Sequence, residues 1–322
     1  MKIALIYYDF SSFVQQDGEI LSRHFKVARV NYRRPFDLFK IFLSAWQCDV
    51  SFSWFASGHS FAAVLFSKLL GKKSIVVAGG YDVACVPEIN YGQFTHSPVR
   101  KFMTEFSLKH ADLVLPVSEF TKKEVLRWAR PKKIQVVYNG IDINRFSAGG
   151  KKEDLVITVG GVSRSNLRRK GLETFVKSAR LVPEARFVVI GKEQDDSINR
   201  LRSIASPNVS FTGFVNDKEL LQWYQMAKVY VQASAYESFG MSLAEAMLCH
   251  CVPVVTERGA LSEVVGETGY YAPFEDEKAT AGAVKAALNS ELGPLARRRI
   301  EALFSQTRRE DSLKEAIEAL FA

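Results

Sequence analysis

The chain has 322 residues, of which 47% are hydrophobic and 24% charged, as in ordinary globular proteins. At roughly 150 residues per domain, this length predicts two domains. The composition excludes disordered, collagen-like and coiled-coil proteins. No apolar stretch approaches the ~20 residues of a membrane-spanning helix, and the first residues lack a signal-peptide pattern, so we expect a cytoplasmic protein.

The net charge of +8 arises entirely in the first half of the chain. Residues 1–147 contain 20 basic and 12 acidic side chains, whereas the remaining residues are balanced. Such asymmetry indicates either a solvated basic face or an anionic partner, such as a membrane surface, a phosphorylated lipid or a nucleic acid. The sequence shows no groove-reading motif and no aromatic stacking platform, so we expect no nucleic acid partner.

Short apolar, β-branched runs alternate with helical stretches along the whole chain. The predicted strands of the first half are Lys2–Tyr8, Phe25–Tyr32, Val50–Phe55, Ser74–Ala78, Asp112–Val117 and Ile134–Tyr138. Those of the second half are Leu155–Val159, Arg186–Ile190, Asn208–Thr212, Val229–Ala233 and Pro253–Thr256. Apolar runs separated by helices are typical of parallel sheets covered on both faces. The pattern predicts an α/β protein with two doubly wound, Rossmann-like domains that face a central cleft.

A small, polar segment over residues 147–152 lies between the two series of strands and is the predicted linker. We therefore expect an N-terminal domain over residues 1–147 and a C-terminal domain over 148–322. The last predicted helix, residues 308–321, carries Leu313, Ile317 and Leu320 on one face. It either stays with the second domain or returns to brace the first. Another helix should follow the capping box formed by Asn216 and Glu219.

Residues 36–46 combine a helical pattern with exposed-looking aromatic residues. Phe36, Phe39, Leu43 and Trp46 recur at helical spacing after the basic pair Arg33-Arg34. One interpretation is a helix that packs on the first sheet. The other is peripheral contact with an anionic membrane, in which the basic end meets lipid headgroups and the aromatic side chains insert.

The segment over residues 233–246 carries the strongest chemical pattern. A strand should end near Ala233, and a helix should begin near Gly240 after a loop of small residues. The free amides at that helix start form an anion site suited to phosphate. Glu237 precedes the helix and Glu245 lies inside it, so both carboxylates can face one bound molecule. A sugar nucleotide fits this arrangement; two solvated glutamates are the alternative.

Glu237 and Glu245, within the run E-S-F-G-M-S-L-A-E-A, resemble the signature of glycosyltransferase family 4, whose members are retaining enzymes with the GT-B fold. Gly213-Phe214-Val215 is similar to the family's base-contacting loop. V-Y-N-G-I-D over 137–142 is similar to the segment that ends the family's first domain. The resemblance covers most of residues 75–275 and implies the same two-domain fold.

The resemblance also implies roles for the matching residues. Glu237 would contact the hydroxyls of the donor sugar, Glu245 would contact the ribose, and Lys170 would pair with the diphosphate as it leaves. Fixed cations can stabilise that developing charge without a metal. Further donor contacts are implied at Gly213, Val215, Phe239, Gly240 and Met241.

The chain departs from the family pattern in both domains. Gly161 stands where the family has an arginine after the first glycine of the second domain. Arg164, Arg168 or Arg169 would supply the missing charge, and Arg169 or Arg164 is preferred. A solvated basic turn is the alternative for this stretch.

In the first domain, the family's histidine-glycine pair is replaced by Gly79-Gly80-Tyr81-Asp82. Asp82 is retained and is the catalytic candidate there, with Gly79 and Gly80 as substrate contacts. The altered loop indicates an unusual acceptor or a lost activity.

The absence of an Asp-X-Asp pair argues against the metal-dependent glycosyltransferases. We therefore expect no cofactor and no metal. The first strand is not followed by a dinucleotide fingerprint, which argues against a nicotinamide enzyme. Cys249-His250-Cys251 has poor spacing for zinc and is better explained by buried thiols.

The expected function is retaining transfer of a hexose from a nucleotide diphosphate donor, such as a UDP- or GDP-sugar, to a hydroxyl of a glycan, glycolipid or lipid-linked acceptor. The resemblance implies that the C-terminal domain binds the nucleotide sugar and the N-terminal domain binds the acceptor. Two alternatives remain open from the sequence. One is a non-catalytic sugar-nucleotide-binding partner of another transferase. The other is a nucleotide-sugar epimerase with the GT-B fold.

Overall fold

A computed structural model describes residues 1–34, 36–95 and 97–322. The chain divides into two compact units. Unit 1 consists of Met1–Asn139 together with Thr307–Ala322, and unit 2 of Gly140–Gln306. The division thus falls before the linker that the sequence indicated, and the last helix returns to unit 1. Among the described residues, no helix combines the length and the apolar character needed to cross a bilayer.

Unit 1 is built on a parallel sheet in the order β2-β1-β3-β4-β5. Its strands are β1 (Lys2–Tyr7), β2 (Lys26–Asn31), β3 (Val50–Trp54), β4 (Lys73–Ala78) and β5 (Leu113–Pro116). Its helices are α1 (Ser12–His24), α2 (Asp37–Gln47), α3 (Gly58–Leu69), α4 (Pro98–His110), α5 (Glu119–Trp128) and α14 (Gln306–Glu318). Two short 3₁₀ helices, η1 (Pro87–Ile89) and η2 (Gln93–Thr95), follow β4.

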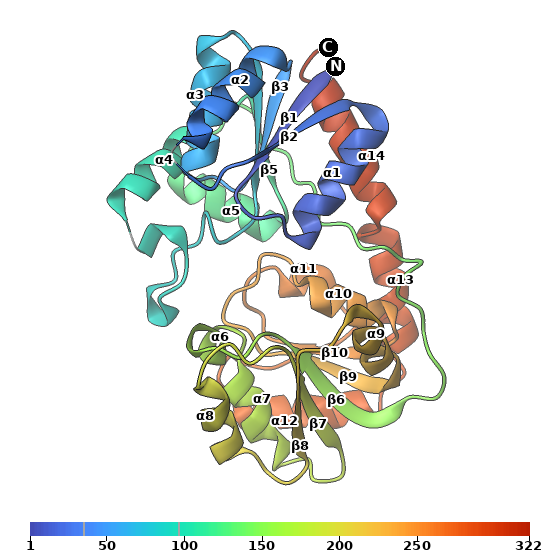
Figure 1. Ribbon diagram of the computed structural model, residues 1–322. Coiled ribbons are helices and arrows are strands. Elements are labelled where there is room, and N and C mark those ends of the chain that lie inside the picture. The colour runs from blue at the N-terminus through green and yellow to red at the C-terminus, as the bar shows by residue number, and fades with distance from the viewer. Residues whose placement is uncertain (35, 96) are drawn as a thin grey trace. The chain divides into compact units, whose positions relative to one another are not determined.

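Helices cover both faces of the unit 1 sheet, which explains why β1, β3, β4 and β5 are buried along almost their whole length. The edge strand β2 is only partly buried. On β1, Ile3 and Leu5 pack with Leu313 and Ile317 of α14 on one face. The alternate residues of β1 pack on the opposite face with residues of α2 and α3, such as Ile41. Figure 1 shows α1 and α14 on one side of this sheet and α2 and α3 on the other.

One predicted strand, Ile134–Tyr138, is wrong. The segment runs beside β5 but forms only the isolated bridge between Ile134 and Val114. Val137 N donates to Pro116 O at 3.0 Å, and the matching return bond to Gln135 O would need an N–H on residue 116. Because proline has none, the ladder stops there.

A buried ion pair attaches α14 to the rest of unit 1. Arg309 is 2% exposed and its Nε and Nη2 atoms lie 2.6 and 2.7 Å from the two carboxylate oxygens of Asp17 in α1. Trp54 Nε1 donates to the same carboxylate at 2.8 Å. Arg309 also donates to the carbonyls of Val137 and Tyr138. This network fixes the C-terminal helix on the first sheet, one of the two placements that the sequence left open.

Unit 2 contains a second parallel sheet, in the order β11-β10-β9-β6-β7-β8. Its strands are β6 (Glu153–Val159), β7 (Arg186–Ile190), β8 (Val209–Gly213), β9 (Ala227–Gln232), β10 (Val252–Val255) and β11 (Tyr270–Tyr271). Its helices are α6 (Arg164–Arg169), α7 (Leu172–Ala179), α8 (Ser197–Ile204), α9 (Asp217–Met226), α10 (Met241–Leu248), α11 (Leu261–Val265), α12 (Glu277–Leu288) and α13 (Gly293–Leu303).

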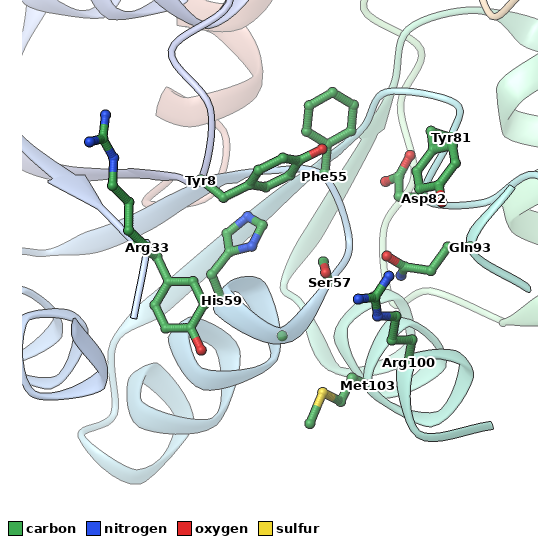
Figure 2. A pocket seen from close by; sticks show the side chains of 12 residues that line it. Tyr8, Arg33, Phe55, Ser57, His59, Tyr81, Asp82, Gln93, Arg100 and Met103 are labelled. Atoms are coloured by element: carbon green, nitrogen blue, oxygen red, sulfur yellow. The ribbon is translucent and has the colours of Figure 1, made fainter. Parts of the chain in front are cut away.

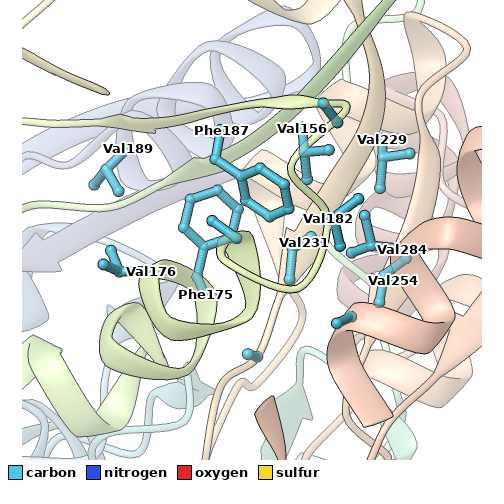
Figure 3. Packing of buried hydrophobic residues seen from close by; sticks show 14 of the residues in the cluster. Val156, Phe175, Val176, Val182, Phe187, Val189, Val229, Val231, Val254 and Val284 are labelled. Carbon is cyan, nitrogen blue, oxygen red and sulfur yellow. The ribbon is translucent and has the colours of Figure 1, made fainter. Parts of the chain in front are cut away.

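The core of unit 2 consists of valine and phenylalanine side chains between the sheet and its helices. Figure 3 shows Phe175 of α7 beside Phe187 of β7, whose ring centroids are 5.2 Å apart. Val284 of α12 belongs to the same cluster. The predicted capping box at the start of α9 is confirmed, since Asn216 and Glu219 exchange side-chain-to-backbone hydrogen bonds. The two parallel α/β sheets confirm the predicted fold class.

We predict that Arg309→Met lowers the free energy of unfolding by about 3–5 kcal/mol, because it leaves the Asp17 carboxylate buried without its cation. The measurement is urea denaturation at neutral pH. Lys314→Met, an exposed site on the same helix, is the control and should change stability by less than about 0.5 kcal/mol. Equal stability of the Arg309→Met protein and the wild type would contradict the prediction.

Candidate functional site

Two loops at one edge of the unit 2 sheet are held in direct contact. Gly171, which follows α6, has φ +66°, and a Cβ atom there would lie 2.0 Å from the carbonyl oxygen of Ala233. Ala235 N donates to Arg169 O at 2.8 Å. Only glycine fits this conformation at such close range. The contact joins the loop after β6 to the loop after β9.

This contact brings together Lys170 and Glu237, which the sequence predicted as catalytic. Lys170 Nζ donates to Glu237 Oε1 at 2.6 Å across 67 residues of sequence. Two polar side chains that the sequence did not single out, Gln232 and Ser234, donate to the same oxygen at 2.9 and 3.2 Å. Arg169 Nη1 lies 4.0 Å away. All four of these groups approach Oε1 of Glu237. The other carboxylate oxygen, Oε2, can therefore still accept hydrogen bonds from a ligand.

The charge on Glu237 depends on these neighbours. Burial by itself would raise the pKa of this carboxyl, but Lys170 and Arg169 more than offset it and hold the pKa below its ordinary value. Glu237 is therefore ionised at neutral pH and can accept hydrogen bonds from sugar hydroxyls.

The start of α10 provides the expected anion site. Gly240 caps the helix at φ +99°. The first intrahelical bond is from Ala244 N to Gly240 O, so the amides of Met241, Ser242 and Leu243 precede the hydrogen-bonded ladder. Phe239 is 1% exposed and packs on Phe304 at 5.4 Å, which fixes the loop before the helix. These amides and the helix dipole favour a phosphate there.

Gly259 positions Glu237 from the other side. A Cβ atom at Gly259 would lie 2.2 Å from the carbonyl oxygen of Glu237, and Ala260 N donates to that oxygen at 2.8 Å. The backbone around Glu237 is therefore fixed by two neighbouring loops, not only by its own side chain.

Glu245 lies inside α10 and contacts a different group. Tyr224 of α9 is fully buried and donates its hydroxyl to Glu245 Oε2 at 3.0 Å. Burial raises the pKa of Glu245, and the hydrogen bond from Tyr224 only partly opposes this. The contact of Glu245 with a ribose stays a prediction.

The structure distinguishes between the candidate arginines. Arg169 is tied to Asn166 through Nε and Nη2 at 3.0 and 2.7 Å and approaches Glu237. Arg168 instead pairs with Glu275 on the surface. Arg164 is exposed, and its backbone N–H bonds to Asp195. Only Arg169 among these three is placed beside the Lys170–Glu237 pair.

The predicted base-contacting loop lies at the end of β8. Gly213 adopts φ +71° and its carbonyl accepts from Gly191 N at 3.0 Å. Val215 is half-buried, whereas Phe214 between them is 75% exposed. Because β6, β8 and β9 are parallel, this loop shares the sheet edge at which Glu237 lies. Its contacts with a base stay a prediction.

The three candidates of the first domain lie together in unit 1. The Asp82 carboxylate is 1% exposed and accepts hydrogen bonds from the backbone amides of Ala56, Gly80 and Gly79 at 2.7, 2.8 and 3.1 Å. Burial raises the pKa of Asp82 to about 6 in spite of these bonds. The carboxyl therefore fixes the loops after β3 and β4, and it also borders a cavity of about 650 Å³ (Figure 2).

The Cys249-His250-Cys251 segment is not arranged as a metal site. Both thiols are fully buried, and Cys251 Sγ contacts the carbonyl oxygens of Tyr224 and Ala227. Among the residues that the structure describes, no cluster of three His, Cys, Asp or Glu side chains is suited to a metal ion.

We predict that Lys170→Met lowers the free energy of unfolding at pH 7 by about 3 kcal/mol, because ionised Glu237 loses its nearest cation. The lowered pKa of Glu237 stabilises the folded wild type above the ordinary glutamate pKa, and this contribution is lost as the pH falls below it. The difference between variant and wild type should therefore shrink below about pH 4, as measured by urea denaturation.

Lys177→Met is the control for this measurement. Lys177 forms a surface pair with Glu173 at 3.5 Å, so its loss should cost less than about 1 kcal/mol. A Lys170→Met deficit that is the same at about pH 3 as at pH 7 would show that Glu237 is not the group involved.

Two family descriptions match the chain, and together they span most of it. "Glycosyltransferase Family 4" matches residues 13–145, and "Glycosyl transferases group 1" matches residues 153–290. The second match contains the whole Lys170–Glu237 site.

The chain is similar to curated glycosyltransferases and to solved structures. It is 25% identical over 192 residues to the O-antigen chain mannosyltransferase RfbU of Salmonella typhimurium, covering 58% of this chain and 53% of that protein. It is 22% identical over 215 residues to a Campylobacter jejuni enzyme, named N-acetylgalactosamine-N,N'-diacetylbacillosaminyl-diphospho-undecaprenol 4-alpha-N-acetylgalactosaminyltransferase, covering 63% and 57%. The matched region thus spans only about half of the length of these relatives.

The crystal structure of Anabaena HepE in complex with UDP and glucose superposes with a TM-score of 0.81 at 15% identity, over 99% of both chains. A likeness at this identity establishes the fold. The two family matches and the Glu237–Glu245 motif add the family to this fold. The chain belongs to the family 4, group 1 glycosyltransferases and has their GT-B fold.

Proposed function

We propose that the protein is a retaining, metal-independent hexosyltransferase that uses a nucleotide diphosphate sugar as its donor. The observation that carries this proposal is the convergence of Lys170, Gln232 and Ser234 on one oxygen of Glu237, just before the start of α10. A carboxylate for sugar hydroxyls therefore lies beside a cation and free amides for a diphosphate.

The donor is bound, in this proposal, by unit 2. Lys170 uses one of its three ammonium hydrogens on Glu237, so the others remain for phosphate oxygens. The amides of Met241, Ser242 and Leu243 bind the diphosphate, and Glu245 binds the ribose. The structurally similar HepE was crystallised with UDP and glucose, which supports a donor of this class.

Loss of the nucleoside diphosphate creates negative charge that has to be stabilised. Lys170 and the α10 amides are fixed before the reaction, which makes them effective without reorganisation. This supports transfer without a metal. Retention of anomeric configuration is proposed from the resemblance of the Glu237–Glu245 motif to retaining enzymes, and a hexose donor from relatives such as the mannosyltransferase RfbU.

The acceptor is proposed to be a glycan or a lipid-linked sugar. The name of the Campylobacter jejuni relative describes a diphospho-undecaprenol-linked acceptor, which supports this class. The second candidate is a non-catalytic sugar-nucleotide-binding partner of another transferase. It is favoured by the commitment of Asp82 to backbone amides, since no acid or base then replaces the family histidine at that position.

The test is a thermal-shift screen with UDP-, GDP-, ADP- and dTDP-hexoses, followed by nucleotide release with the donor that binds. A donor at 100 times its Kd should stabilise the fold by about 2.7 kcal/mol. We expect nucleotide release that is unchanged by EDTA, and NMR of the freshly released sugar should show the donor's anomeric configuration. Glu237→Gln and Lys170→Ala should each lower the rate by about 100-fold or more.

Glu193→Gln and Lys177→Ala, which alter surface pairs in the same unit, should leave the rate unchanged. If no sugar nucleotide stabilises the protein, the donor site is wrong. If a donor binds but is neither hydrolysed nor transferred, the non-catalytic alternative is correct.

We also propose a peripheral membrane contact through α2. Ile41 and Ala45 of this helix are buried, so it packs on the sheet by one face. The aromatic stripe of the sequence analysis lies outside that contact, with Phe36, Phe39 and Trp46 exposed by 89%, 66% and 64%. The helix can therefore pack on the first sheet by one face and still present its aromatic side chains to a membrane by the other. Exposed Arg33 and Arg34 directly precede it and provide charge complementary to anionic lipid.

We predict that the wild type sediments with phosphatidylglycerol vesicles at low salt and that Phe36→Ser/Phe39→Ser/Trp46→Ser reduces binding by about tenfold or more, because the inserting rings are gone. The control is Leu295→Ser/Leu303→Ser/Phe321→Ser, which removes three other exposed apolar residues. Vesicles of pure phosphatidylcholine should bind less than anionic ones. No binding of the wild type to anionic vesicles would refute the membrane contact.

A further inference from the structure

The cavity of unit 1 has two chemically different sides. Its volume is about 650 Å³, and it lies within the loops that follow β1, β3 and β4 and the start of α4. Figure 2 shows Tyr8 and His59 on one side and Asp82, Gln93 and Arg100 on the other, with Ser57 between them. The first side is aromatic except for Arg33, and the second is polar.

A strained aromatic residue marks the aromatic side. Phe55, directly after β3, adopts φ +68°, a left-handed conformation that is costly for a residue with a Cβ atom. Its ring packs so closely on Gly79 that a Cβ there would lie 2.2 Å from it. The ring also lies 5.6 Å from that of Tyr8. Strain of this kind is found at binding sites, where the surrounding structure enforces it.

The hydrogen bonds of Gln93 fix the orientation of its amide. Thr104 Oγ1 donates to Ala56 O at 2.7 Å, so this hydroxyl can only accept from Gln93 Nε2. Gln93 Nε2 also donates to Ala56 O at 2.8 Å, which uses its second hydrogen. The side chain is 4% exposed, and no donor from the described residues reaches Oε1. Figure 2 shows this oxygen turned toward the cavity. Gln93 thus offers an acceptor at the cavity to a ligand.

His59 offers a second acceptor. Its Nε2 atom lies 2.6 Å from Trp54 O, which can only accept, so Nε2 carries the hydrogen and Nδ1 carries a lone pair. Burial lowers the pKa of His59 to about 4, so the ring is neutral at physiological pH. Two neutral acceptors suit the hydroxyl groups of a sugar, and aromatic rings suit its C–H faces.

The cation of the polar side is Arg100, in the first turn of α4. Its guanidinium has no ion-pair partner within the described ranges, and Figure 2 shows it directed toward Gln93 and Asp82. The neighbouring Lys101, by contrast, extends to Glu105 and to the ring of Trp128. An unpaired guanidinium at a cavity favours a phosphate or a carboxylate of the ligand.

We propose that this cavity binds a sugar that carries an anionic group, a phosphate or a carboxylate, with its ring between Tyr8 and Gln93 and its charge on Arg100. This molecule is the acceptor of the transfer reaction, and that part of the inference rests on the proposed function. The proposal names Tyr8, Gln93 and Arg100 as its binding residues.

The test uses calorimetric titration with matched pairs of ligands. The 1-phosphates of glucose, galactose, mannose and N-acetylglucosamine are each compared with the corresponding methyl glycoside, and glucuronate and inorganic phosphate are measured alone. At least one 1-phosphate should bind about tenfold more tightly than its glycoside and than inorganic phosphate. Binding of glucuronate in addition would identify carboxylate as an alternative anion. Absence of a preference in all four pairs would overturn the proposal.

Two variants test the assignment of the binding residues. Arg100→Gln should remove the preference for the 1-phosphate and leave the affinity for the methyl glycoside unchanged. Lys101→Gln, with the same change of charge on the same helix, should have no effect. Tyr8→Ala, at a residue that is 44% exposed, should weaken both members of a pair. A preference that survives Arg100→Gln would show that the anion binds elsewhere.

Donor binding separates this inference from the proposed function. Affinity for the sugar nucleotide should be the same in the wild type, Arg100→Gln and Tyr8→Ala, because these residues belong to unit 1. If the anionic sugar binds but never accepts the transferred sugar, the cavity is a binding site for it, and the proposal that this molecule is the acceptor is wrong. If transfer proceeds equally well to neutral sugars in Arg100→Gln, the proposed function remains and this inference is wrong.

Discussion

The ion pair between Lys170 and Glu237 is the interaction on which the candidate site of unit 2 depends. It exists because Gly171 lets the loop after β6 approach the carbonyl of Ala233, where no larger residue fits. In the same way, Gly259 lets the loop after β10 lie directly against the backbone of Glu237, where a Cβ atom would not fit. The position of the Glu237 carboxylate is thus fixed mainly by contacts of the backbone, and its ion pair with Lys170 adds to them. A site fixed in this way needs little rearrangement to receive a diphosphate and a sugar.

The sequence predicted the sheets well because most of their strands are buried on both faces. A strand such as β1 needs apolar residues at every position, and such runs are conspicuous. One predicted strand is wrong and one strand, β11, was not predicted, and each of these errors has a local cause. Ile134–Tyr138 has the right composition, but the partner that would continue the ladder is Pro116. β11 has only two residues, too few to show any period.

The residues of the candidate site could be predicted only where they belong to a recognisable sequence motif. Glu237, Glu245 and Lys170 belong to such patterns, and the fold places Lys170 on Glu237. Gln232 and Ser234 could not be found, because a polar residue at the end of a strand usually has no ligand. Phe55 is a candidate for the proposed sugar site only because of its backbone angle, and Gln93 only because of the partners that use up its amide hydrogens. These features arise from tertiary contacts that no local pattern contains.

The buried charges of unit 1 have structural tasks, which limits what this unit can contribute to catalysis. Asp17 is neutralised by Arg309, and Asp82 is surrounded by backbone amides that it holds in place. His59 has a pKa of about 4, far too low for an efficient base at neutral pH. Among the other polar groups that line the cavity, Gln93 and Arg100 do not exchange protons there. In the proposed reaction, unit 1 is therefore suited to orienting an acceptor, and the developing charge would be stabilised in unit 2 by Lys170 and the first amides of α10.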